Sequence, residues 1–209
     1  MKLNKQDLSL YLVTDRHWTK DQSLVEQVEA GLKGGVTMVQ LREKNLSDEE
    51  FLLKALELKE LTTTYKVPFM INDNVWVAIQ SDADGIHIGQ DDLPADEVRK
   101  LVGEEKILGV SVQTVEQAQI AKRQGADYLG VGAVFSTDTK KDAKHVPLQV
   151  LKEICEAVNL PVVAIGGIDE DNVDELTGSG ICGVAVVSAI LASDDIMQAA
   201  KNLKRDWVL

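Results

Sequence analysis

Two cationic side chains and one amide alternate with apolar residues in a short segment early in the chain. If this segment is a strand, alternate side chains point to opposite faces, so Gln40, Arg42 and Lys44 share one face. Burying two cations is costly unless an anion meets them. Arg42 can bind phosphate oxygens in bidentate fashion, so the pattern indicates a phosphate-binding strand. The alternative is internal ion pairing, with Asp73 or Asp92 as partner.

Carboxylates follow the next two apolar runs. Asn72 and Asp73 end one run, and Asp91 and Asp92 follow another that contains His87. Adjacent parallel strands lie ~4.8 Å apart, so carboxylates just beyond their ends can share one small cation. Mg²⁺ is typically held by one or two carboxylates, with water and substrate phosphates completing its shell. The residue pattern predicts such a site but does not choose between Asp91 and Asp92.

Helix capping is the alternative explanation for these aspartates. Asp91 or Asp92 would then start a helix that begins near Pro94. Capping does not account for Asn72 and Asp73 at the end of an apolar run. His87 stands within a run, and we expect it to be a hydrogen-bonded core histidine rather than a ligand.

Glycines and a serine follow the last two apolar runs. Backbone N–H groups of Gly166, Gly167 and Ser188 can bind a phosphomonoester without any lysine. Tight packing of strand against helix is the alternative, and we expect it to explain one of the two glycines better than both.

A polar loop offers further anion ligands. It carries the hydroxyls of Thr137 and Thr139 and the ammonium group of Lys140. Together the segments predict two anion sites, one cationic and metal-assisted for a pyrophosphate, the other built of backbone amides for a monophosphate. A reaction that joins a pyrophosphate ester to a phosphorylated acceptor uses both, with Mg²⁺, Arg42, Lys44 and Lys140 stabilising the departing pyrophosphate.

Short β-branched runs must position these residues. Most are apolar on both faces, as parallel strands covered on both sides are. The expected strands are residues 9–13, 38–41, 69–71, 85–88, 107–110, 128–131, 162–165 and 184–187.

Helical patterns lie between several of these runs. Three helix starts have capping-box spacing, at Ser23 and Glu26, Ser47 and Glu50, and Thr114 and Gln117. In the second helix we expect the apolar stripe to consist of Leu52, Leu53, Leu56 and Leu61.

Strands alternating with helices over residues 1–209 predict a single α/β domain, a (β/α)8 or TIM barrel. A doubly wound open sheet is the alternative. Against it, no Gly-x-Gly-x-x-Gly follows the first run, and the gap between the third and fourth runs leaves little room for a full crossover helix. In such barrels the active site lies at the C-terminal ends of the strands, where the polar residues above fall.

Composition narrows the classes of function. The 209 residues are 44% hydrophobic and 27% charged, as is typical of a soluble globular protein. A net charge of −12 argues against general binding to nucleic acid or to an anionic membrane. The polar N-terminus lacks the apolar run of a signal peptide, and we expect a cytoplasmic protein with Cys155 and Cys182 as buried thiols.

Together these segments resemble the thiamine phosphate synthase (thiamine-phosphate pyrophosphorylase) family. The resemblance runs in order over nearly the whole chain. The matching stretches are Leu12-Val-Thr-Asp15, Val39-Gln-Leu-Arg-Glu-Lys44, Ile71-Asn-Asp73, Gly85-Ile-His-Ile-Gly-Gln-Asp-Asp-Leu-Pro94, Leu108-Gly-Val-Ser111, Gly125-Ala-Asp-Tyr-Leu-Gly-Val-Gly132, Thr137-Asp-Thr-Lys140, Ala164-Ile-Gly-Gly-Ile168 and Val184-Ala-Val-Val-Ser188.

The resemblance implies a reaction and a set of site residues. The family condenses a hydroxymethylpyrimidine pyrophosphate with a thiazole phosphate, forming thiamine phosphate and releasing pyrophosphate by a dissociative route. It implies Asp73 and Asp92 as Mg²⁺ ligands, and Arg42, Lys44 and Lys140 as the catalytic cations. For the pyrimidine pyrophosphate it implies Gln40, Arg42, Lys44, Asn72, Ser111 and Lys140, and for the thiazole phosphate Thr137, Thr139, Gly167, Val187 and Ser188.

The sequence departs from the family pattern at two loop positions, where Ala133 and Ser136 replace the usual prolines. Two other functions compete: a thiazole tautomerase-like paralogue and a non-catalytic barrel that binds thiazole phosphate. Asp73, Asp92 and Lys140 favour the synthase, because tautomerisation needs no pyrophosphate site. The expected partners are small-molecule substrates, with no nucleic acid and no membrane, and a homo-oligomer is left open.

Overall fold

Eight parallel strands close into one barrel, in which each strand pairs with the next along the chain and β8 pairs with β1. The computed structural model describes residues 3–19, 21–137 and 144–207 of the chain. The strands are β1 (Leu10–Val13), β2 (Met38–Leu41), β3 (Phe69–Asn72), β4 (Gly85–Ile88), β5 (Ile107–Val112), β6 (Tyr128–Val131), β7 (Val162–Ile165) and β8 (Gly183–Val186). The prediction of a (β/α)8 barrel is confirmed, and the open-sheet alternative is wrong.

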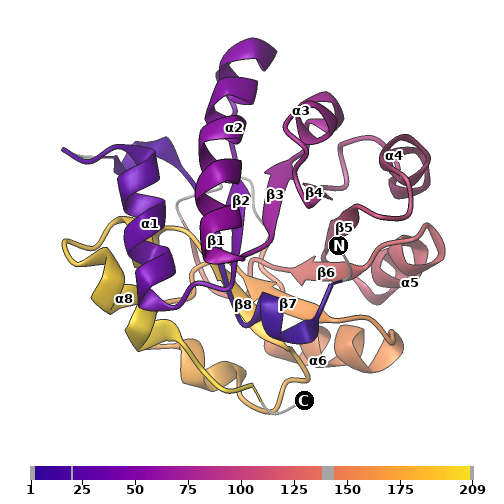
Figure 1. Cartoon of the computed structure of the whole chain (residues 1–209). Helices are drawn as coiled ribbons and strands as arrows, with labels where there is room; N and C mark the ends of the chain where they lie inside the picture. Colours follow the sequence, from indigo (N-terminus) through magenta and orange to yellow (C-terminus); the bar gives the residue numbers. More distant parts are fainter. Residues whose placement is uncertain (1–2, 20, 138–143, 208–209) are drawn as a thin grey trace.

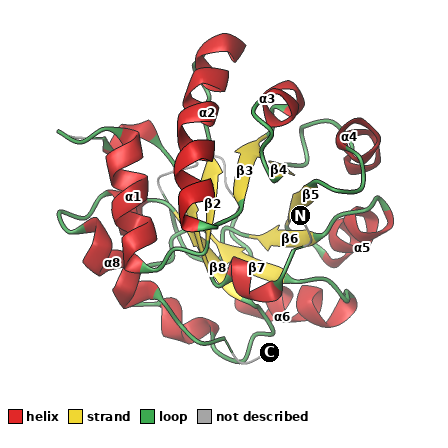
Figure 2. Ribbon diagram, in the orientation of Figure 1, coloured by secondary structure: helices red, strands yellow, loops and turns green. Residues whose placement is uncertain are grey.

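Helices form a ring outside the strands (Figure 1, Figure 2). The α-helices are α1 (Leu24–Gly34), α2 (Asp48–Tyr65), α3 (Val75–Gln80), α4 (Ala95–Val102), α5 (Val115–Arg123), α6 (Leu148–Ala157), α7 (Ser188–Leu191) and α8 (Ile196–Leu203). Short 3-10 helices are η1 (Lys5–Leu8), η2 (Arg16–Trp18) and η3 (Val173–Leu176). Between β3 and β4 the crossover is the short α3, as the narrow gap in the sequence predicted.

The core divides into two parts because side chains alternate along every strand. One cluster fills the barrel interior and includes Tyr11, Met38, Met70 and Tyr128, while a larger one lies between the strands and the helices. Leu8, at the end of η1, is fully buried within the interior cluster. The N-terminal segment, indigo in Figure 1, therefore closes the end of the barrel opposite the mouth.

Helix starts follow the predicted capping chemistry. Ser23 and Ser47 each accept a hydrogen bond from the backbone N–H three residues on, and the carboxylates of Glu26 and Glu50 accept one from the backbone N–H of the cap residue. Thr114 caps α5 by accepting from Gln117 N–H, so all three predicted starts are confirmed, although the Gln117 side chain accepts from Gln113 N–H and does not complete the capping box.

The predicted leucine stripe of α2 is wrong for Leu53 and Leu56, whereas Leu61 packs against the core and Leu52 is half-buried. The buried positions of this helix are Phe51, Ala55, Leu58 and Thr62, whereas the side chains of Leu53 and Leu56 are exposed. These buried positions recur at spacings of three and four, so they too form one helical face. Ala55 is fully buried on this face.

Burial raises the pKa of both thiols, Cys155 and Cys182, to about 11. Cys182 is buried, as expected, and Cys155 is half-buried. In the part of the chain that the structure describes, no helix combines the length and the apolarity needed to cross a bilayer.

A glycine lets α1 and α8 pack closely, and its replacement tests that packing. A Cβ at Gly34 would lie 2.5 Å from the Ala200 Cβ and 2.5 Å from the Met197 carbonyl oxygen. We expect Gly34→Ala to lower the free energy of unfolding by about 1–3 kcal/mol, the usual cost of overpacking, measured by urea denaturation. Gly31→Ala is the control in the same helix, because its Cβ would first meet the flexible end of the Leu12 side chain at 3.3 Å. Equal stability of the two variants would contradict the prediction.

Candidate active site at the barrel mouth

The two cations that follow β2 are each held by a carboxylate from a neighbouring strand end. Lys44 Nζ lies 2.5 Å from Asp73 Oδ2, just beyond β3. Arg42 Nη1 lies 3.5 Å from Asp15 Oδ2, just beyond β1. The ion-pairing alternative therefore holds for Lys44 with Asp73, but the partner of Arg42 is a residue that the sequence did not indicate. Because the Arg42 contact is long and partly exposed, it is a weak pair and leaves the guanidinium accessible to an anion.

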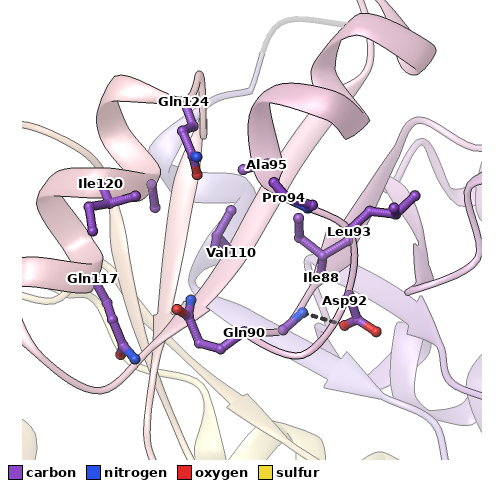
Figure 3. A pocket seen from close by; sticks show the side chains of 12 residues that line it. Ile88, Gln90, Asp92, Leu93, Pro94, Ala95, Val110, Gln117, Ile120 and Gln124 are labelled. Carbon is purple, nitrogen blue, oxygen red and sulfur yellow. Dashed lines mark hydrogen bonds between the residues drawn. The ribbon is translucent and has the colours of Figure 1, made fainter.

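Asp73 and Asp92 come close to one another at the same rim. Partial burial of its carboxyl group raises the pKa of Asp92, and the nearby Asp73 carboxylate raises it further, while a hydrogen bond from Gly89 N–H lowers it. That bond, from Gly89 N to Asp92 Oδ2, measures 2.7 Å (Figure 3). Asp73 adopts a left-handed backbone conformation, with φ of 61°, which is uncommon for an aspartate. The geometry brings together the two carboxylates that the resemblance implied as metal ligands.

The capping alternative is wrong for Asp91 and Asp92. Helix α4 begins at Ala95, and Pro94 occupies the N-cap position. The Asp92 carboxylate instead closes the turn after β4 through its bond to Gly89. Its role in the fold is therefore local, and its second oxygen can take another ligand.

The donor set at the rim fits a magnesium ion shared with a phosphate-bearing substrate. Within residues 3–19, 21–137 and 144–207, no three His, Cys, Asp or Glu side chains are placed to hold a metal ion together. Two carboxylates, from Asp73 and Asp92, are what Mg²⁺ commonly takes from a protein when phosphates and water supply its other ligands. A site for Zn²⁺, which prefers histidine and cysteine, does not fit these residues.

Below the rim, polar side chains reach into the barrel interior. Gln40 Nε2 donates to the Tyr11 hydroxyl at 2.6 Å, and Ser111 Oγ lies 2.8 Å from His87 Nε2. The other nitrogen of His87, Nδ1, lies 2.8 Å from the Tyr128 hydroxyl. His87 is buried with both ring nitrogens hydrogen-bonded, so the prediction of a core histidine is confirmed.

The glycine pair after β7 is required by packing. Gly166 and Gly167 both have positive φ, at 98° and 66°. A Cβ on Gly166 would lie 2.5 Å from the Ala133 Cβ, and one on Gly167 would lie 2.2 Å from the Ser136 carbonyl oxygen. Packing against the loop after β6 therefore accounts for both glycines, whereas the expected alternative was packing of strand against helix. The loop after β6 rests directly on this pair.

The remaining predicted ligands that the structure describes follow β6 and β8. Val187 and Ser188 connect β8 to α7, and both are half-buried. Thr137 is half-buried in the loop after β6. Thr139 and Lys140 lie outside the described residues.

Sequence reasoning missed Glu43. Its side chain is only 4% exposed, Oε2 accepts from Arg16 Nε at 2.9 Å, and Oε1 has no hydrogen-bond partner in the described part of the chain. Burial raises the pKa of this carboxyl group, although Arg16 opposes the shift. The sequence signal that could have indicated its burial is that Glu43 shares a strand face with the apolar residues Val39 and Leu41. Beside it a cavity of about 300 Å³ opens between the ends of β2 and β3, lined partly by Lys44.

A second cavity, of about 190 Å³, lies between α4 and α5 (Figure 3). Its lining combines apolar side chains with four polar residues, Gln90, Asp92, Gln117 and Gln124. Gln90 Nε2 donates to the Ser111 carbonyl oxygen at 2.7 Å, so this residue joins the turn after β4 to the end of β5. Asp92 thus stands between this cavity and the mouth, whereas the cations Arg42 and Lys44, which suit phosphate binding, follow β2 on the mouth side.

Comparison with known proteins agrees with this geometry. A family model described as thiamine monophosphate synthase matches residues 10–190. The chain belongs to this family. The thiamine-phosphate synthase of Clostridium tetani is 53% identical over 94% of each chain, and that of Methanobrevibacter smithii is 48% identical over 98% of each chain. The solved structure of a thiamine phosphate pyrophosphorylase from Pyrococcus furiosus superposes with a TM-score of 0.88, at 39% identity and covering 95% of each chain.

These relatives bear on the competing functions. The ones named above are synthases or pyrophosphorylases, and their similarity spans nearly the full length of this family member. The tautomerase-like and non-catalytic alternatives are therefore not favoured.

The buried histidine makes stability depend on pH. Burial lowers the pKa of His87 from 6.5 to about 4, against a smaller opposing effect of the Asp92 carboxylate. Between these values the unfolded chain binds more protons, so stability falls as the pH falls from about 6.5 towards 4. We expect acidification from pH 8 to pH 5 in EDTA to cost the wild type about 2 kcal/mol more than it costs His87→Gln.

Urea denaturation at both pH values measures this difference. His145→Gln is the matched control, because His145 is exposed and its removal should leave the wild-type dependence intact. The groups that face the His87 ring are Tyr128, Ser111 and the Asp92 carboxylate. If His87→Gln lost as much stability on acidification as the wild type, the assignment would be wrong.

Proposed function

We propose that this protein condenses 4-amino-5-hydroxymethyl-2-methylpyrimidine pyrophosphate with hydroxyethylthiazole phosphate, giving thiamine phosphate and pyrophosphate. Membership of the thiamine monophosphate synthase family supports the reaction class. The observation that carries the proposal is the cluster of Lys44, Asp73 and Asp92 at the mouth. It combines a cation with two carboxylates, as recognition of a metal-bound pyrophosphate requires.

The pyrophosphate end of the first substrate would bind on the β2 side. Arg42 and Lys44 follow this strand and stand beside the carboxylates. Both side chains are partly exposed at the rim, so an incoming anion can meet them without displacing core residues. Asn72 adds an amide at the end of β3. These groups stabilise negative charge that increases on the pyrophosphate as its bond to carbon breaks.

Asp73 and Asp92 would hold Mg²⁺. When bound, the ion neutralises charge on the leaving pyrophosphate. Lys44 orients Asp73 through their ion pair, and Gly89 N–H orients Asp92. Both carboxylates are thus positioned before any ion arrives.

The second substrate would bind on the opposite side of the mouth, through Thr137, Thr139, Gly167, Val187 and Ser188. Loops after the seventh and eighth strands are the common phosphate site of TIM barrels. Gly167 lets the backbone approach closely there, and Ser188 begins α7.

The bond changes balance without any protein nucleophile. The carbon–oxygen bond to pyrophosphate breaks first, and the electron pair leaves with the pyrophosphate. The amino group of the pyrimidine ring stabilises the resulting methyl cation by electron release. The thiazole nitrogen then donates its lone pair to that carbon, and no proton needs to move. The residues of the mouth therefore act by binding, orienting and stabilising charge.

Direct assay tests the activity. We expect purified protein, mixed with both substrates and Mg²⁺, to form thiamine phosphate and pyrophosphate in equal amounts, followed by chromatography. EDTA should abolish the product and added Mg²⁺ should restore it. Folded protein that yields no thiamine phosphate under these conditions would refute the proposal.

A pair of neighbouring aspartates tests the ligand assignment. We expect Asp92→Asn to lower kcat/KM at least about 100-fold, because losing about 3 kcal/mol of charge stabilisation slows a step by that factor. Asp91→Asn removes the same charge one position earlier, from an exposed side chain, and should retain near wild-type activity. Calorimetry should show Mg²⁺-dependent binding of pyrophosphate to the wild type and to Asp91→Asn, and weak binding to Asp92→Asn. Equal activity of the two variants would remove Asp92 from the site.

A further inference from the structure

A chain of hydrogen bonds crosses the interior of the barrel, through residues to which the proposed function gives no role. The hydroxyls of Tyr11, on β1, and Tyr128, on β6, lie 2.9 Å apart. Tyr128 then meets His87 Nδ1, on β4, at 2.8 Å. Burial raises the pKa of both phenols, so each hydroxyl keeps its single proton at working pH.

Each end of this chain meets a residue that the proposed function places against the pyrimidine pyrophosphate. Gln40 Nε2 donates to the Tyr11 hydroxyl at 2.6 Å, and His87 Nε2 lies 2.8 Å from Ser111 Oγ. The chain therefore couples a ligand on β2 to a ligand on β5 across the barrel. Neither end can change its hydrogen bonding without affecting the other.

The number of available protons fixes the direction in which each hydrogen bond of this series is donated. Because the Gln40 amide nitrogen donates to Tyr11, the Tyr11 proton goes to Tyr128, and the Tyr128 proton goes to Nδ1 of His87. Nδ1 is then an acceptor, so the neutral imidazole carries its proton on Nε2. That proton is donated to Ser111 Oγ, and the Ser111 hydroxyl proton is left for a ligand.

The two ends consequently differ in what they offer. Gln40 has its nitrogen engaged on Tyr11 and offers its carbonyl oxygen as an acceptor. Ser111 accepts from His87 and offers its hydroxyl as a donor. An aminopyrimidine carries the complementary pair, since its amino group donates and the adjacent ring nitrogen accepts.

We propose that Tyr11, Tyr128 and His87 are positioning residues that set this polarity and so select an aminopyrimidine over a pyrimidinone. A pyrimidinone presents the reverse pair, with a ring N–H donor beside a carbonyl acceptor. Binding it would require either mismatched contacts or reversal of every hydrogen bond in the chain. The inference rests on the proposed function, which supplies the pyrimidine as ligand.

Two glycines make room for the chain. A Cβ on Gly109 would lie 2.2 Å from Cζ of Tyr128 and 2.5 Å from Nδ1 of His87. A Cβ on Gly130 would lie 3.1 Å from Cε1 of His87. At these inward-facing positions the barrel gives up apolar packing, and the polar side chains occupy the space.

The tautomer of His87 is the first test. Nitrogen NMR of protein labelled with ¹⁵N-histidine, at pH 8, should show the His87 proton on Nε2, with the signals assigned by their loss in His87→Gln. A proton on Nδ1 would mean that the chain runs the other way, and would overturn the proposal. This test uses the wild-type protein and does not depend on the folding of a variant in the chain.

Ligand preference is the second test, measured by calorimetry with Mg²⁺ and without thiazole phosphate. The two probes are the aminopyrimidine pyrophosphate and its 4-pyrimidinone analogue. We expect the wild type to prefer the aminopyrimidine about 100-fold, because a site built around hydrogen bonds rejects a ligand that leaves its groups unpaired. Tyr128→Phe breaks the chain at its centre and should reduce this preference about tenfold.

Tyr65→Phe is the matched control. The Tyr65 hydroxyl donates to Glu29 Oε1 on the helical layer, far from the mouth, so its removal should leave the preference unchanged. If Tyr128→Phe does not fold, Tyr11→Phe breaks the same chain one residue earlier. If folded Tyr128→Phe or Tyr11→Phe prefers the aminopyrimidine as strongly as the wild type does, the polarity proposal is overturned. The proposed condensation activity is not affected by that result. Failure of the wild type to bind either pyrimidine would refute the proposed function itself, and this inference with it.

Discussion

The ion pair between Lys44 and Asp73 is the contact on which the arrangement of the mouth depends. It joins the ends of β2 and β3 and brings a cation and a carboxylate to the same point. The chain as a whole carries a net charge of −12, so a phosphate-bearing ligand approaches an unfavourable field except where cations are concentrated. Pairing also keeps each charge partly neutralised before the ligand binds.

The two carboxylates at the mouth, Asp73 and Asp92, also influence one another electrostatically. Burial of the Asp92 carboxyl group raises its pKa most, and the nearby Asp73 carboxylate raises it further, so the proximity of the two carboxylates is unfavourable. Such a pair is expected where a divalent cation is to be shared, because the ion removes the repulsion that the empty pair experiences. The backbone N–H of Gly89 donates to Asp92 and fixes the position of this carboxylate, and in the proposed function the carboxylate pair would bind the cation beside the cations that bind the anion.

Much of this was predictable from residue order because strand periodicity is strict. Alternation placed Gln40, Arg42 and Lys44 together, and the rule that barrel sites lie at C-terminal strand ends placed Asp73 and Asp92 near them. Helix faces were less predictable. The buried stripe of α2 includes Phe51 and Ala55 and leaves Leu53 and Leu56 exposed, because α2 has apolar residues on more than one face and its packing on the barrel selects one of them.

The sequence by itself determined the alternation of strands and helices, the capping residues, and the chemical types gathered at the mouth, since these depend on local spacing. Only the tertiary structure decided the pairings: Arg42 with Asp15, Gly167 against the carbonyl of Ser136, and the hydrogen-bond chain through Tyr11 and Tyr128. Barrel closure brings these partners together from distant positions. Their contacts depend on register and on strand order around the barrel, and the spacing of residues within one segment predicts neither of them.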